Sequence, residues 1–143
     1  MAVQATPDQV IQFRQLTDST QSARRRLQEL LKLPASTAKP DWIHNTYPMT
    51  SDLEEALAEN ERFIQSFTKE QKDGLKKFSK QLLKADSAIT NDNKKLNRDL
   101  ESDAVGGPEI AGTLDKLKKA LDDFQSQQSA IAAEMGIPSP TAN

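Results

Sequence analysis

His44 is the only histidine of the chain, and histidine is the side chain whose ordinary pKa lies nearest neutral pH. It belongs to segment 42–48 (WIHNTYP), which also holds the only Trp and the only Tyr. A general base needs a nucleophile or a metal within reach, and the sequence identifies neither beside His44. Trp42, His44 and Tyr47 are therefore candidates for a recognition surface. The alternative is a structural role, in which the aromatic residues cover one end of the fold.

Metal and nucleophile chemistry has little support elsewhere in the chain. The absence of cysteine excludes disulfides, thiolate metal sites and cysteine nucleophiles. The chain has 21 Asp and Glu residues, but a ferritin-like di-metal site needs Glu-x-x-His motifs and the sequence contains none. We therefore expect no enzyme activity, no metal and no cofactor.

The charge balance argues against nucleic acid as a partner. The 19 Lys and Arg residues are offset by 21 Asp and Glu residues, which gives a net charge of −2. The triplet Arg24–Arg26 points in different directions on a helix, and no aromatic residue is interleaved with the basic ones to stack on bases. We expect no nucleic-acid partner.

No run of residues approaches the roughly 18 consecutive apolar residues that a membrane-spanning helix needs, so we expect no transmembrane segment. Residues 1–6 lack the basic start and apolar stretch of a secretory signal. Two compartments stay open. The chain is either cytoplasmic, or exported with Met1 in place of a removed signal peptide.

Helices must position all of these side chains, because apolar residues recur at alternating spacings of three and four. We predict helices near 7–33, 52–66, 69–102 and 109–135. Thr6–Gln9, Ser51–Glu54 and Thr68–Gln71 each read as a capping box, and Gly136 reads as a left-handed helix end. The fold expected is a single all-α domain over 1–143, an up-down four-helix bundle with unequal helix lengths. No sequence repeat is evident beyond the shared heptads.

Residues 51–102 allow two interpretations. The apolar pattern changes phase near 66–74, so this stretch is either a hairpin or one long helix in a three-helix, coiled-coil-like arrangement. Segment 52–67 is acidic, whereas a row of lysines, hereafter the lysine row, follows it: Lys69, Lys72, Lys76, Lys80 and Lys84. Like charges at this spacing repel each other on an isolated helix. A hairpin that lays the acidic helix beside the lysine row would relieve that repulsion, so we favour the hairpin.

Pro34, Pro40 and Pro48 predict one long loop over residues 34–50, packed through its aromatic residues. Residues 138–143 are expected to form a flexible tail. With this loop, the second helix would span about 22 Å and could not cover a third helix of about 50 Å. Ile89, Leu96 and Leu100 would then remain uncovered, and we predict them as a surface for a partner or for self-association.

Phe67-Thr68-Lys69-Glu70-Gln71 resembles the Leu-Thr-x-x-Gln motif of periplasmic helical stress chaperones, which cradle unfolded proteins. The resemblance covers five residues, and Phe stands where the family has Leu. Segment 16–21, as a second copy, has one residue too many. The resemblance implies an exported, chaperone-like stress protein.

Three functions are therefore open. Heptad patterns on every helix and the lack of a catalytic constellation favour a non-enzymatic interaction protein that binds a protein partner or itself through helix faces. The second is a carrier or sensor of an apolar small molecule held between the helices, with Phe residues as walls: Phe13, Phe63, Phe67, Phe78 and Phe124. The chaperone-like role stands third. Three polar residues stand at heptad positions that are otherwise apolar: Thr20, Asn60 and Gln128. We expect them to fix the register in which the helices pack.

Overall fold

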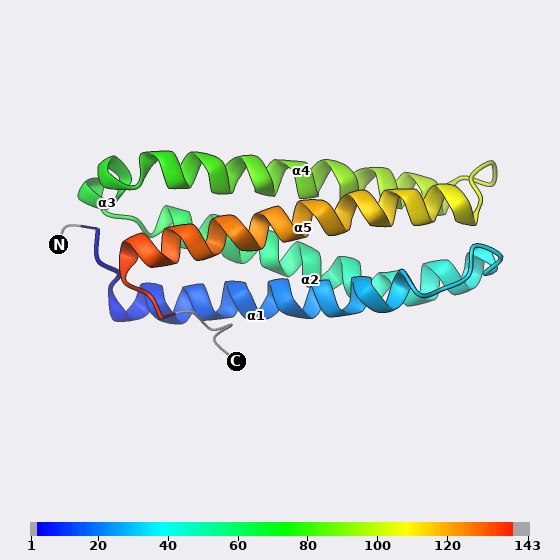
Figure 1. Ribbon diagram of the computed structural model, residues 1–143, viewed down its shortest axis with the longest axis horizontal. Coiled ribbons are helices and arrows are strands. Elements are labelled where there is room, and N and C mark those ends of the chain that lie inside the picture. The colour runs from blue at the N-terminus through cyan, green and yellow to red at the C-terminus, as the bar shows by residue number, and fades with distance from the viewer. Residues whose placement is uncertain (1–2, 139–143) are drawn as a thin grey trace.

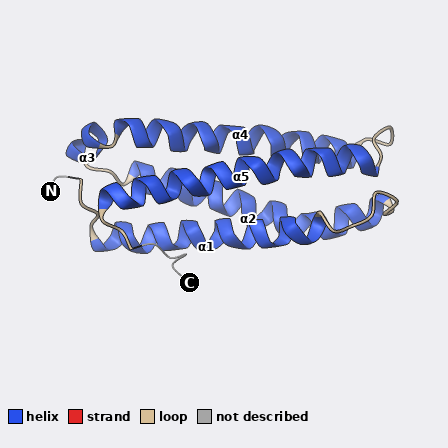
Figure 2. Cartoon of the chain, viewed as in Figure 1, coloured by secondary structure: helices blue, strands red, loops and turns tan. Residues whose placement is uncertain are grey.

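The computed structural model describes residues 3–138, and every regular element in that range is a helix (Figure 2). Four long helices, each antiparallel to the previous one, run along a common axis: α1 (Pro7–Leu30), α2 (Lys39–Gln65), α4 (Lys76–Glu101) and α5 (Gly107–Met135) (Figure 1). The short α3 (Lys69–Gly74) precedes α4. The predicted all-α, up-down bundle is confirmed. Apart from Pro138, the predicted tail at 138–143 lies outside the described residues.

The chain reverses direction after α2, so residues 51–102 form a hairpin. Ser66 ends α2, and Thr68 begins α3 as its N-cap. From there the helix is almost continuous, because the Leu75 and Ser79 amides donate to the carbonyls of Gln71 and Leu75 across the bend between α3 and α4. The expected charge pairing across this hairpin is absent among residues 3–138, where no ion pair joins segment 52–67 to the lysine row.

The prediction of a loop over residues 34–50 is wrong from Lys39 onward, since α2 begins there. Pro40 occupies the first turn of α2, where its missing N–H costs no hydrogen bond. Pro48 lies inside the helix and does cost one, yet the helix continues through it. The compensation is burial, because this half of α2 places a regular set of side chains in the core: Trp42, Thr46, Met49, Thr50 and Leu53.

The longer α2 also overturns the predicted partner surface on α4. The N-terminal half of α2 lies beside the C-terminal half of α4, where Thr46 and Thr50 line one hollow together with Leu100. Ile89 and Leu96 are 0% exposed, and Leu100 is half-buried against the core. These three residues therefore belong to the interior of the bundle and form no uncovered face.

The bundle is built from two hairpins, since α1 packs mainly on α2 and α4 packs mainly on α5. Buried polar pairs join the hairpins. Gln128 Nε2 of α5 donates to Thr20 Oγ1 of α1 over 3.0 Å, and Asn60 Nδ2 of α2 donates to Asp86 Oδ2 of α4 over 2.9 Å. Burial raises the pKa of Asp86 above its ordinary value, against the opposing effect of the hydrogen bond from Asn60.

At one end of the bundle the two hairpins meet in a reciprocal pair of buried amides. Gln9 Nε2 donates to Gln71 Oε1, and Gln71 Nε2 donates to Gln9 Oε1, both over 2.8 Å. Each oxygen also accepts the N-cap amide of its own helix, from Thr6 and Thr68 respectively, so two of the three predicted capping boxes are confirmed. The third, Ser51–Glu54, is wrong, because Ser51 lies inside α2 and begins no helix. The remaining donors bind the backbone carbonyls of Ser66 and Gln4. Every hydrogen-bonding site on the two side-chain amides is therefore used.

The hairpins also match each other residue by residue, a repeat that was not evident from the sequence alone. With constant spacing, α1 aligns with α3–α4 and α2 aligns with α5. Residues in equivalent positions are alike and mostly buried in both hairpins: Thr6 and Thr68, Gln9 and Gln71, Phe13 and Leu75, Ala23 and Ala85, Leu27 and Ile89, then Met49 and Leu117, Leu53 and Leu121, Asn60 and Gln128, Phe63 and Ile131. The repeat escaped detection because it preserves burial and polarity more than identity.

Candidate functional site

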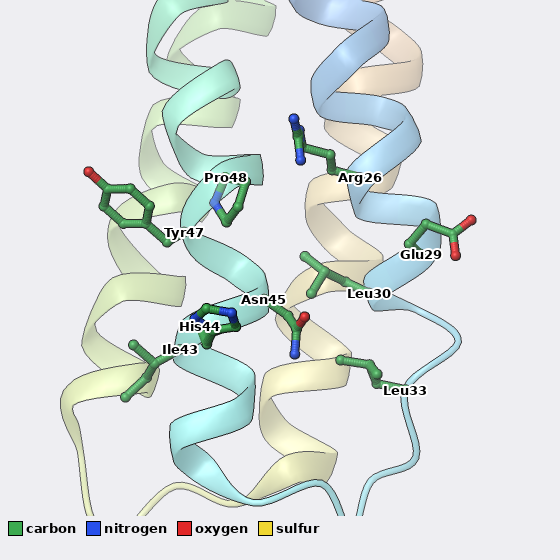
Figure 3. A pocket seen from close by; sticks show the side chains of 9 residues that line it. All are labelled: Arg26, Glu29, Leu30, Leu33, Ile43, His44, Asn45, Tyr47 and Pro48. Carbon is green, nitrogen blue, oxygen red and sulfur yellow. The ribbon is translucent and has the colours of Figure 1, made fainter.

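A hollow of the surface lies between the C-terminal end of α1 and the N-terminal half of α2 (Figure 3). It has a volume of about 650 Å³. Arg26, Glu29, Leu30 and Leu33 line it from α1 and the turn that follows, and Ile43, His44, Asn45, Tyr47 and Pro48 line it from α2. We call this hollow the neutral groove.

The structure separates the three residues that were predicted to form a recognition surface. Trp42 is 1% exposed and belongs to the core, so its prediction as a surface residue is wrong. His44 and Tyr47 do line the neutral groove. Sequence reasoning missed Ile43, because a segment taken for a loop gives no helical spacing from which to place Ile43 and Tyr47 on one face.

Ile43 and Tyr47 form an exposed apolar ridge one helical turn apart on α2. Tyr47 is 73% exposed and Ile43 is 47% exposed, although both side chains are large and apolar in their bulk. The ridge separates the neutral groove from a smaller hollow of about 160 Å³ on the α4 side, which Thr46, Asn97 and others line. Figure 3 shows Ile43 and Tyr47 on the opposite side of α2 from Asn45, which points toward Leu30 of α1.

Unsatisfied polar groups accompany this ridge. Trp42 Nε1 and Thr46 Oγ1 are buried and find no hydrogen-bond partner among residues 3–138. Pro48 has no N–H, so the carbonyl of His44 lacks the helical hydrogen bond that another residue at position 48 would supply. Buried polar groups without partners cost stability, so this part of α2 is not optimised for stability alone.

The charged residues of the neutral groove are already paired within the chain. Arg26 Nε lies 2.7 Å from Asp52 Oδ2, and Lys32 Nζ lies 3.2 Å from Glu29 Oε1. The groove therefore presents apolar surface and hydrogen-bonding groups without an excess of either charge.

The second hairpin serves as an internal control for the ridge. The positions of α5 equivalent to Ile43 and Tyr47 are occupied by Ala111 and Asp115, and Lys116 stands where Pro48 stands in α2. A helix in this architecture therefore folds without an exposed apolar ridge and without an internal proline. The ridge is therefore a feature that the fold itself does not require.

The other predicted site residues have structural surroundings. Phe13 and Phe63 pack with ring centroids 5.3 Å apart, and Phe63 and Phe67 with centroids 5.1 Å apart. The Phe67–Gln71 motif contributes its Phe to this cluster and its Thr and Gln to the capping box.

Among residues 3–138, no group of three His, Asp or Glu side chains is placed to hold a metal ion, and no helix is long and apolar enough to cross a membrane. The chain was also compared with protein-family models, with curated proteins and with solved structures, and none of them matches it.

Proposed function

We propose that this protein is a non-enzymatic interaction module that associates with a second copy of itself through the apolar ridge and the neutral groove. The observation that carries the proposal is the pairing of Ile43 and Tyr47, both exposed, with a groove at their side, whereas the matching hairpin has Ala111 and Asp115 at the equivalent positions. Large exposed apolar side chains beside a hollow are typical of protein interfaces, in which Tyr is enriched.

A second copy fits the surface because a ridge next to a groove is complementary to itself. In a two-fold interface, the same patch of each copy faces the other, so Tyr47 of one copy can enter the groove of its partner while the reverse contact also forms. The paired charges around the groove add no net repulsion between two copies. We expect an affinity in the micromolar range, since only two large apolar side chains per copy are exposed here.

Sedimentation equilibrium over a range of concentrations tests the proposal. The unchanged chain should show a reversible dimer, and the double variant Ile43→Ser with Tyr47→Ser should weaken dimerisation by about a hundredfold, because it removes both apolar anchors from both copies. Ile11→Ser is the matched control, since Ile11 is an equally exposed apolar residue near the far end of α1.

Thermal unfolding of each variant should show that the bundle is intact, because these side chains are outside the core. A chain that stays monomeric at millimolar concentration, or a dimer that the double variant leaves unchanged, would show that self-association through this surface is wrong.

A further inference from the structure

A second groove lies near the opposite end of the bundle, between the C-terminal end of α2 and the start of α4. Its volume is about 410 Å³, and its apolar residues are Ile64, Phe67 and Leu83. Leu83 is 44% exposed, which is unusual for a large apolar residue in this chain. Lys72, Lys76 and Lys80 line the same hollow, so we call it the lysine groove.

The positive charge around the lysine groove is not neutralised within the described chain. Residues 69–84 contain six lysines and only two carboxylates, Glu70 and Asp73. None of these lysines makes an ion pair or a side-chain hydrogen bond with another residue in the range 3–138, whereas lysines elsewhere, such as Lys32 and Lys95, do. The repulsion that was expected to be relieved by segment 52–67 therefore persists in the folded bundle.

The repeat again shows that the fold does not require this charge. The positions of α1 equivalent to Lys72, Lys76 and Lys80 are Val10, Arg14 and Asp18, a set with no net charge. Gln21 stands where α4 has the exposed Leu83. The first hairpin is built on the same pattern without these lysines and without an exposed leucine. The fold therefore does not need the lysines of the groove, which is consistent with a role in binding.

One polar group in the groove also lacks a partner. Ser79 Oγ is buried and makes no hydrogen bond to any described residue, although Ser79 lines the hollow among the lysines. A bound segment that places a hydrogen-bonding group above Ser79 would satisfy it.

We propose that the lysine groove binds an acidic amphipathic helix of a partner protein. Lys76 and Lys80 are four residues apart on α4, about 6 Å along its axis, and Lys72 lines the same hollow from α3. A partner helix with carboxylates at every fourth residue presents them at the same interval, and the apolar side chains beside those carboxylates enter the hollow over Ile64, Phe67 and Leu83. This proposal is independent of self-association, because it involves a different surface of the bundle.

The shape of the site favours a helix over the other anionic candidates. Phe67 is almost fully buried and Ile64 is half-buried, so a flat lipid surface would touch Leu83 but would not fill the hollow. Nucleic acid would find phosphate-binding lysines here, but the aromatic ring in the groove, Phe67, is too buried to stack on a base. An apolar hollow with a basic rim matches a ligand that carries both apolar and acidic groups in fixed register.

The test uses the full chain and a defined peptide, because the partner is unidentified. The probe is a fluorescently labelled helical peptide with Glu at every fourth position and Leu beside it, and its control has Lys in place of each Glu. Fluorescence anisotropy should show binding of the Glu peptide only, and the binding should weaken at high ionic strength. The triple variant Lys72→Gln, Lys76→Gln, Lys80→Gln should lower the affinity by about tenfold or more, since each exposed ion pair contributes a few-fold.

Two matched controls isolate the groove from general charge and from folding defects. Lys94→Gln, Lys116→Gln and Lys119→Gln remove the same charge from other exposed positions and should leave the affinity within about twofold, because distant exposed charges are screened. Leu83→Ser should lower the affinity several-fold, whereas Ile11→Ser should not.

Equal binding of the Lys peptide, or an equal loss in the control triple variant, would show that no such site exists. Anionic phospholipid vesicles or a single-stranded DNA oligonucleotide are measured in parallel. If either binds with the same lysine dependence while the Glu peptide does not, the helix proposal is wrong. Failure here leaves the dimer measured by sedimentation unaffected, so the two proposals are judged separately.

Discussion

The first and second hairpins share an internal plan but differ on their outer faces. Both begin with a Thr-x-x-Gln capping box, and both place an amide at the same level of their second helix, Asn60 in one and Gln128 in the other. Outside the core they diverge, because the first hairpin exposes Ile43 and Tyr47 whereas the second carries the lysine row.

This difference distinguishes residues that the fold requires from residues that it merely accommodates. Where both hairpins agree, the shared residues are those that pack or hydrogen-bond inside the bundle. Where they disagree, one hairpin shows that the bundle can be built without the feature found in the other. Both grooves proposed above consist largely of residues of the second kind.

The largest effect is expected where the hairpins agree most closely. Gln71→Ala should lower the free energy of unfolding by about 3 kcal/mol, because it removes a capping interaction and leaves the side-chain amide of Gln9 and the carbonyl of Gln4 without their partner. Gln9→Ala should cost a similar amount, because Gln9 makes the equivalent contacts at the start of the first hairpin. Urea unfolding measures both, with the exposed Gln81→Ala as control. A cost no greater than that of Gln81→Ala would contradict the importance of the pair.

The next effect concerns the close approach of α5 to the turn after α1. A Cβ added to Gly107 would overlap the carbonyl oxygen of Ala35, so Gly107→Ala should destabilise the bundle by about 2 kcal/mol through a forced backbone shift. Gly112→Ala, on the same helix with nothing within 4 Å of the added Cβ, should instead be neutral or stabilise by up to about 1 kcal/mol. Thermal unfolding compares them, and equal midpoints would rule out the tight contact.

Lys39 provides a contact between the hairpins that has no counterpart at the start of α5. Its Nζ donates to the carbonyls of Asp99, Ser102 and Val105, at 3.1, 2.7 and 2.7 Å, where α4 ends. Lys39→Met keeps most of the apolar stem and should cost about 1.5 kcal/mol, since a cation at a helix C-terminus is favourable. Lys32→Met, which breaks only an exposed pair with Glu29, should cost less than about 0.5 kcal/mol. Similar costs in chemical unfolding would show that the three carbonyl contacts add nothing.

The smallest effect is a gain in stability. It concerns the two buried polar pairs between the hairpins, of which Thr20–Gln128 is neutral and Asn60–Asp86 contains a carboxyl group. Asp86→Asn should stabilise the bundle at neutral pH by about 1 kcal/mol, because burial of the ionised carboxylate is unfavourable and the new amide can donate to Asn60 Oδ1, which has no partner among residues 3–138.

The pH dependence of this gain has a definite sign. The folded-state pKa of Asp86 is raised above its ordinary value of 3.8, so the folded state binds the proton more tightly than the unfolded state. The stability that Asp86 contributes is complete below pH 3.8 and is lost as the pH rises through the folded-state pKa. The advantage of Asp86→Asn should therefore grow between these limits in unfolding curves recorded at several pH values. An advantage independent of pH would contradict the assignment to ionisation.

Asp99 should behave in the opposite way. Burial alone would raise the pKa of Asp99, but hydrogen bonds from Thr113 and Lys95 and the charges of Lys95 and Arg98 hold it below its ordinary value. The stability that Asp99 contributes is therefore present above its unfolded-state pKa and is lost as the pH falls through its folded-state pKa. A Thr113→Val variant should reduce that loss on acidification.

Periodicity and capping predicted most of the architecture, because heptad spacing and boxes such as Thr68–Gln71 act locally. The start of α2 was missed, since Pro40 and Pro48 are local signals for a break, while the burial of Trp42 and Met49 in the core is a tertiary effect. That single error also misplaced the candidate site. A shortened α2 implied an uncovered Ile89 and Leu96, and it concealed the helical spacing that brings Ile43 and Tyr47 together.

The amide pair of Gln9 and Gln71 has a further consequence for a chain without cysteine. It connects side chains 62 residues apart, a separation over which other small domains use a covalent bridge. A disulfide opens under reducing conditions, and an ion pair weakens with salt or with a change in proton concentration. Two neutral amides have no redox state, no titrating proton and no net charge, so this clasp should hold equally in reducing and oxidising compartments and across the acidity range that alters Asp86 and Asp99.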